Sequence, residues 1–151
     1  MALSLKERIQ EDMKSAMRNK DSTRLGIIRL IMAAIKQREV DERITLNDPQ
    51  VVEVLDKMLK QRRESIIQYE KGQRQDLADK EAFEITIVQE YLPPALDETE
   101  LEALINEAIN IAGANTAKDM GRVIGILKPR IQGRADMAKV SGRIKEKLSA
   151  P

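Results

Sequence analysis

Apolar residues recur at three- and four-residue intervals along most of the chain, which is the spacing typical of amphipathic α-helices. The clearest row is Leu101, Leu104, Ile105, Ala108, Ile109 and Ala112. No segment shows a convincing alternation of apolar and polar residues of the kind that marks a half-buried strand. The pattern therefore predicts an all-α protein.

Capping residues and helix breakers divide this pattern into seven predicted helices. Ser4-Leu5-Lys6-Glu7 reads as a capping box, in which the serine and glutamate side chains satisfy free backbone N–H groups. Asp48-Pro49 marks another start, because proline suits the first helical position. The predicted helices begin near residues 4, 22, 48, 76, 97, 117 and 135. Pro129 is expected to follow the end of the sixth helix.

The Leu92-Pro93-Pro94-Ala95 stretch is the best candidate for a domain boundary. The residue before a proline avoids the helical region, so two adjacent prolines end the fourth helix. We expect a four-helix N-terminal lobe over residues 1–95, followed by a small three-helix C-terminal lobe over residues 96–151.

The second predicted helix is apolar nearly all round between Leu25 and Ile35. A helix without a polar face is typically buried, so we expect this helix at the centre of the N-terminal lobe. Arg29 interrupts the apolar stretch. It is interpreted as a partly buried arginine paired with a carboxylate, with an anion-binding arginine in an interhelical groove as the alternative.

The 151 residues include no histidine and no cysteine, and the aromatic residues are Tyr69, Phe83 and Tyr91. Nucleophile–base pairs usually need His or Cys, and structural zinc sites need one or both. No EF-hand loop, GxxxxGK[ST] or GxGxxG motif occurs. The carboxylates Glu81 and Glu84 and the basic run at residues 60–63 are interpreted as solvated helix faces. We predict no catalytic residue, no cofactor and no metal site, and the composition weighs against self-sufficient catalysis.

Localisation signals are also absent from the pattern. No run approaches the roughly 18 apolar residues of a membrane span. The N-terminal residues carry acid early, unlike a signal or transit peptide. We therefore expect a cytoplasmic protein without a membrane partner.

The near-neutral total charge of +1 hides a strong local asymmetry. Residues 96–117 carry five acids and no base, whereas residues 118–148 carry nine bases and three acids. A basic turn leading into a helix N-terminus favours phosphate. The candidate nucleic-acid-binding residues are Arg122, Lys128, Arg130, Arg134, Lys139 and Arg143. The equally weighted alternative is that this basic segment docks on the acidic fifth helix.

Gly121 and Gly125 lie one turn apart in the sixth predicted helix, where each costs up to about 1 kcal/mol relative to alanine. This cost suggests that another helix or a ligand approaches the backbone closely. Because aromatic residues are so few, stacking on single-stranded bases is disfavoured. An RNA ligand would be recognised as a folded structure, through its shape and phosphates.

An ordered series of motifs resembles the YqeY family of small bacterial proteins. It runs from Lys60-Gln61-Arg62 through Tyr91-Leu92-Pro93 to Asp119-Met120-Gly121-Arg122-Val123 and Gly133-Arg134-Ala135-Asp136. The last two motifs also resemble the tail of GatB, the B subunit of the tRNA-dependent amidotransferase. The resemblance covers essentially the whole chain and implies a bacterial protein. It supplies no catalytic residues, since the chain is similar only to the helical and tail portions of that subunit.

Three functions follow from these observations. The first is a tRNA-binding accessory module linked to a tRNA-dependent amidotransferase or to aminoacyl-tRNA metabolism. The second is a protein-interaction module that docks on an amidotransferase or aminoacyl-tRNA synthetase component without contacting RNA. The third is carbon–nitrogen ligase activity with glutamine as amide donor, which rests on the family label alone.

Overall fold

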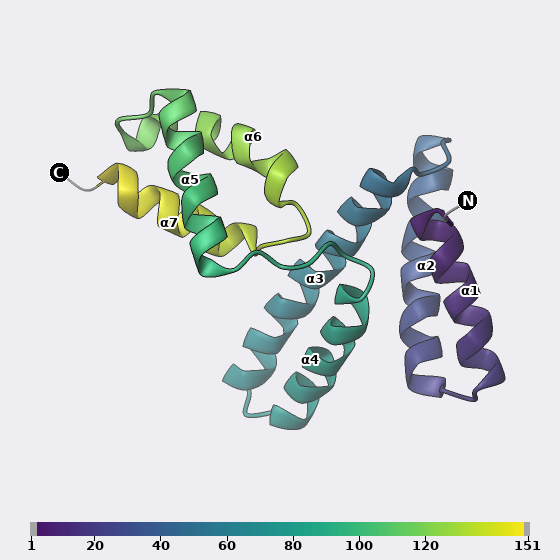
Figure 1. Cartoon of the computed structure of the whole chain (residues 1–151). Helices are drawn as coiled ribbons and strands as arrows, with labels where there is room; N and C mark the ends of the chain where they lie inside the picture. Colours follow the sequence, from purple (N-terminus) through teal and green to yellow (C-terminus); the bar gives the residue numbers. More distant parts are fainter. Residues whose placement is uncertain (1–2, 150–151) are drawn as a thin grey trace. The chain divides into compact units, whose positions relative to one another are not determined.

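A computed structural model describes residues 3–149, which contain seven α-helices, one 3-10 turn and no strand (Figure 1). The predicted all-α class is thereby confirmed. The elements are α1 (Leu5–Arg18), α2 (Ser22–Glu42), α3 (Asp48–Lys71), α4 (Gln75–Gln89), α5 (Glu98–Ala112), η1 (Ala117–Asp119), α6 (Met120–Ile131) and α7 (Met137–Ser149).

The chain forms two compact units, which divide between Pro93 and Pro94. The N-terminal unit contains α1–α4, and the C-terminal unit contains α5–α7 with η1. The division falls two residues before the boundary predicted from the sequence. Pro94 and Leu96 belong with the C-terminal unit because both bond to Arg134.

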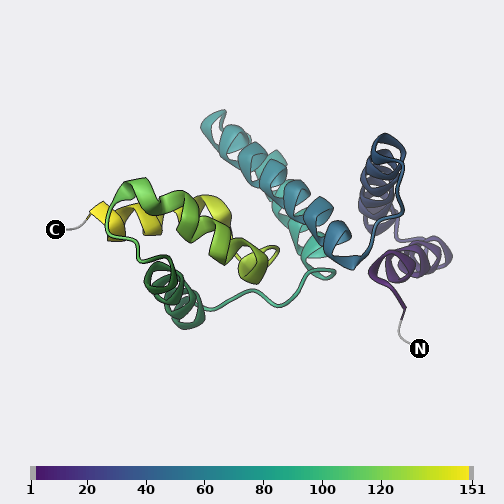
Figure 2. The same cartoon turned by 90° about the horizontal axis from the view of Figure 1, so that it is seen from above.

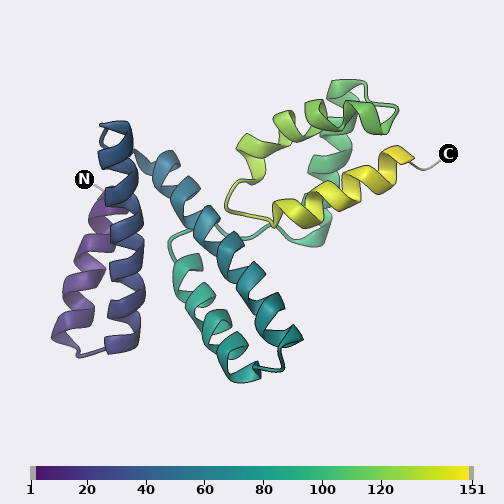
Figure 3. The same cartoon turned by 180° about the vertical axis from the view of Figure 1, so that it is seen from behind.

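Two antiparallel helix pairs build the N-terminal unit. α1 lies beside α2 and α3 lies beside α4, as the views from the front and from behind agree (Figures 1 and 3). One apolar core joins the two pairs, with Ile9 of α1, Ile31 of α2, Leu55 of α3 and Val88 of α4 fully buried. The cap predicted at Ser4 forms, since its side chain accepts the Glu7 N–H, whereas α3 is capped by Asn47 and begins with Asp48 and Pro49.

The second helix is less buried than its sequence predicts. Ile27, Ile28, Ile31 and Ile35 of α2 are buried, but the opposite side of the helix is exposed. Arg29 is exposed and makes no polar contact within residues 3–149, so the expectation of a partly buried, paired arginine is wrong. The reason is geometric: α1, α3 and α4 pack against α2 from one side only.

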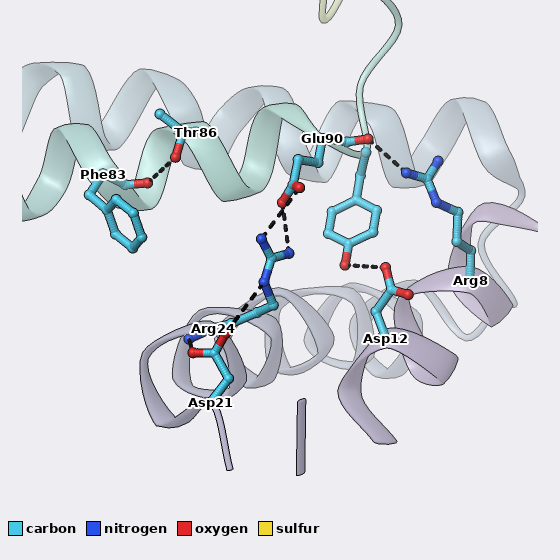
Figure 4. A network of polar contacts seen from close by, with 8 residues as sticks. Arg8, Asp12, Asp21, Arg24, Phe83, Thr86 and Glu90 are labelled. Atoms are coloured by element: carbon cyan, nitrogen blue, oxygen red, sulfur yellow. Dashed lines mark hydrogen bonds and ion pairs between the residues drawn. The ribbon is translucent and has the colours of Figure 1, made fainter. Parts of the chain in front are cut away.

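Polar contacts fix the end of α4 against the α1–α2 pair (Figure 4). The Tyr91 hydroxyl donates to Asp12 Oδ2 at 2.6 Å, and Arg24 Nη1 lies 2.7 Å from Glu90 Oε2. Arg8 Nη2 donates to the Glu90 carbonyl at 2.8 Å. The chain therefore leaves the N-terminal unit from a point held by both helix pairs.

In the C-terminal unit, α5 lies across the pair formed by α6 and α7 (Figures 1 and 2). Its core is a single apolar cluster that includes the fully buried Ile105, Val123, Leu127 and Ile144. Gly113 ends α5 in the left-handed region at φ 61°.

Three helix boundaries differ from the prediction. Pro129 lies inside α6 instead of after its end, because buried Ile131 continues the apolar row of Val123 and Leu127 and holds the last turn helical. α7 begins at Met137, where the Asp136 side chain accepts the Ala138 N–H at 3.0 Å. The start near 117 is a 3-10 turn that precedes α6.

Candidate nucleic-acid interface

Acidic residues of α5 neutralise much of the basic segment that follows it. Arg130 of α6 pairs with Glu107, with Nη1 and Oε1 3.0 Å apart. Arg143 of α7 pairs with Glu98 and approaches Glu102, which also binds Lys147. Three of the nine basic residues of this segment, Arg130, Arg143 and Lys147, are thus paired with acids of α5.

Two of these pairs each shift the pKa of one partner. The hydrogen bond to Glu98 raises the pKa of Arg143, and the hydrogen bond from Lys147 lowers the pKa of Glu102. Solvent screens exposed ion pairs of this kind, so they contribute little to stability and mainly orient α5.

Arg122 is exposed at the start of α6 and pairs with Asp119. Asp119 also accepts the backbone N–H groups of Asn115 and Thr116, at 3.0 and 3.3 Å. The hydrogen bond from the Asn115 N–H has the largest effect on the pKa of Asp119, and the hydrogen bond from Arg122 has the next largest. Together they lower this pKa to about 2. The positive charge of Arg122 is therefore shared with a fixed carboxylate.

Arg134 has a role inside the unit. Its Nε donates to the Pro94 carbonyl at 3.0 Å, and its own carbonyl accepts the Leu96 N–H at 3.0 Å. It lies in the turn between α6 and α7, next to Gly133, whose φ of 77° suits glycine. Arg134 thereby fixes the segment that leads into α5.

Lys128 and Lys139 differ from the other four predicted residues. Both are exposed, and neither side chain makes a hydrogen bond or ion pair with any residue between 3 and 149. Lys118 and Lys145 share these properties, although the sequence analysis did not select them. For Lys128, Lys139 and Lys145, the position outside the buried rows of α6 and α7 is the signal that could have identified them.

The exposed side of α6 also carries Gly121 and Gly125. A Cβ atom built at either position would meet no atom within 4 Å, and the same holds for Gly142 on the exposed side of α7. The expectation that another helix of the chain approaches these glycines is therefore wrong. What remains is a bare backbone surface, flanked by Arg122 and Lys128.

Two features read as solvated helix faces are partly buried instead. Arg62 of α3 lies between Glu81 and Glu84 of α4, and all three side chains are at most 20% exposed. They are buried because the α3–α4 pair closes over them.

The described residues contain no group of three or more His, Asp or Glu side chains placed to hold a metal ion. Over the same range, no helix is long and apolar enough to cross a membrane.

Comparison with known proteins places the chain in context. The family model YqeY, described as Yqey-like protein, matches residues 6–148. A protein named altered inheritance of mitochondria protein 41, mitochondrial, from Pyrenophora tritici-repentis is 31% identical over 147 residues, which cover 95% of this chain and 80% of that protein. The protein of the same name from Vanderwaltozyma polyspora is 32% identical over 120 residues, which cover 74% of this chain and 64% of that protein.

These relatives correct two predictions. They are fungal proteins with "mitochondrial" in their names, which contradicts the expected bacterial origin and cytoplasmic location. The expected location rested on N-terminal residues unlike a signal or transit peptide and on the absence of a long apolar run. The resemblance drawn from the sequence motifs is confirmed: the chain belongs to the YqeY family.

Proposed function

We propose that this chain is an RNA-binding accessory module, with tRNA as the expected ligand. It would serve a tRNA-dependent amidotransferase or another step of aminoacyl-tRNA metabolism. The observation that carries the proposal is the set of four unpaired lysines on the C-terminal unit: Lys118, Lys128, Lys139 and Lys145.

Unpaired cations matter because phosphate binding is driven by the release of counterions. A cation already paired with a carboxylate must give up that partner before it can bind a phosphate. Arg130, Arg134 and Arg143 are held by contacts within the unit, so we assign them a positioning role. Lys128 and Lys139 remain as the predicted phosphate contacts, whereas Arg122 shares its charge with Asp119.

The bare glycine surface of α6 supports the same assignment. Without side chains at Gly121 and Gly125, a phosphate backbone can approach the helix more closely than alanine would permit. Lys128 on the same side of α6 would then contact the phosphates. This contact is independent of base identity, which fits a folded RNA recognised by shape.

The proposal is tested by measuring tRNA affinity at 50 and 200 mM salt with the full chain. Neutralising four phosphates gives a fall of roughly a hundredfold in affinity between these concentrations. The variant with all four lysines changed to glutamine should lose most of this salt dependence, because each lost contact reduces the slope by about one.

A matched control removes four unpaired, exposed lysines from the N-terminal unit: Lys57, Lys60, Lys71 and Lys80. Their change to glutamine alters the net charge equally and should leave most of the affinity intact. Equal losses in both variants would reduce the binding to a general charge effect. No binding by the unaltered chain at low salt would refute the proposal.

A further inference from the structure

The exposed side of α2 carries a seven-residue repeat. Its central row is Gly26, Ala33 and Val40, and all three are exposed. Residues seven apart lie on the same side of a helix, which is the geometry of a coiled-coil seam. Val40 of this row is 63% exposed and Leu30 next to the row is 53% exposed, so this side of α2 presents large apolar side chains to solvent.

We call this row and its two edges the α2 seam. The two edges differ in charge. One edge is uncharged and consists of Leu30 and Gln37, with Ile44 just beyond the helix. The other edge is basic and consists of Arg29 and Lys36, with Arg43 at the C-cap.

No carboxylate compensates the basic edge. Arg29, Lys36 and Arg43 are exposed, and their side chains have no polar partner in the described part of the chain. The acids of α2 are engaged elsewhere: Glu39 binds Lys6 and the Leu46 N–H.

The remaining acids of α2 also have partners. Glu42 pairs with Arg38, and Asp41 accepts a hydrogen bond from Gln37 on the uncharged side. The other two arginines of the helix, Arg24 and Arg38, are paired with glutamates. The basic edge therefore presents a row of charge at intervals of about two helical turns.

We propose that the α2 seam binds an amphipathic helix of a partner protein, and that this helix carries an acidic edge. The small residues Gly26 and Ala33 of the central row let the partner helix pack closely. The apolar side chains of the seam supply the buried contact. The basic edge selects the partner and its orientation, as charged flanking positions do in coiled coils.

A second copy of this chain fits the seam poorly. A second α2 offers no acidic row to the basic edge, in either a parallel or an antiparallel orientation. A nucleic acid fits poorly as well, since the central row is apolar. The seam lies in the N-terminal unit and is separate from the lysines of the proposed RNA interface, so neither proposal depends on the other.

A pair of synthetic peptides tests the proposal. Each is an amphipathic helix of about 21 residues with leucine in the seam positions, and the charged edge is glutamate in one and lysine in the other. Fluorescence anisotropy with the full chain should show binding of the glutamate peptide at least about tenfold tighter than that of the lysine peptide.

The variant Arg29→Glu/Lys36→Glu should reverse this preference. The matched control Lys60→Glu/Lys71→Glu changes two exposed, unpaired lysines of α3 and should retain it. Far-UV circular dichroism checks that each variant stays folded. Equal binding of both peptides, binding of neither, or a preference that survives the charge reversal would overturn the proposal.

Vesicles containing about 30% anionic lipid distinguish a membrane from a protein partner. The proposal expects no vesicle binding that depends on the basic edge. Vesicle binding lost in Arg29→Glu/Lys36→Glu, with no peptide binding, would assign the seam to an anionic membrane surface instead.

Discussion

Changing Arg62 to methionine should destabilise the N-terminal unit more than most single substitutions. Arg62 is the cation between Glu81 and Glu84, with Nη1 2.9 Å from Glu81 Oε2. The side chains of Arg62 and Glu84 are each only 12% exposed. Methionine would fill most of the volume while leaving two carboxylates at the α3–α4 interface without a counter-charge.

The expected magnitude follows from this burial. Removing one partner of a buried ion pair typically costs about 3–5 kcal/mol, because the remaining charge is desolvated and uncompensated. Small domains are stable by only about 5–15 kcal/mol, so the loss is a large share of the total. The double variant Arg62→Met/Glu84→Leu should recover most of the loss, since a well-packed apolar pair can replace a buried ion pair.

Urea unfolding followed by tyrosine fluorescence measures this effect in the full chain. Tyr69 and Tyr91 both lie in the N-terminal unit, so the signal reports that unit alone. The neighbouring Arg63 has no polar partner among the described residues, and Arg63→Met should change the free energy of unfolding by about 0.5 kcal/mol or less. A loss in Arg62→Met no larger than in this control would refute the reasoning, as would a double variant without recovery.

Three further predictions concern other parts of the chain. Tyr91→Phe removes a buried hydrogen bond to Asp12 and should cost about 1.5–3 kcal/mol in thermal unfolding. Burial raises the pKa of Tyr91. The protonated hydroxyl therefore stabilises the fold fully below the ordinary pKa of 10.0, and this stabilisation is lost as the pH rises through the raised pKa. The pKa of Asp119 is lowered to about 2, so the stability difference between the wild type and Asp119→Asn should persist at neutral pH and disappear as the pH falls from about 4 to 2 in thermal unfolding. Gly121→Ala should stabilise α6 by up to about 1 kcal/mol in urea unfolding followed by circular dichroism, while weakening tRNA binding.

Sequence patterns predicted the helices well because caps and apolar spacing act locally. Ser4, Asp97 and Gly113 begin or end their helices as expected. The misplaced boundary at Pro129 shows the limit of local rules. A proline in a helix interior costs about 3 kcal/mol, yet the burial of Ile131 keeps the last turn of α6 helical.

The functional surfaces were harder to predict because they depend on which side of a helix its neighbours cover. Arg130 and Arg143 look like phosphate contacts in a charge count, but α5 supplies glutamates to both. Arg29 lies in an apolar stretch of sequence, yet it is exposed because α2 packs on one side only. Pairing and exposure of this kind are properties of the packed helices and have no local sequence signature.

The turns of the two units use different residues. In the C-terminal unit, glycines take the left-handed positions, whereas the three turns of the N-terminal unit use Lys20, Arg43 and Gln73 at φ 55–59°. A side chain in this region costs about 1–2 kcal/mol. The N-terminal unit therefore folds despite strain at every turn. Substitution of Lys20 or Gln73 by glycine during evolution would relieve this backbone strain. The stability gained would allow the N-terminal unit to tolerate destabilising mutations elsewhere.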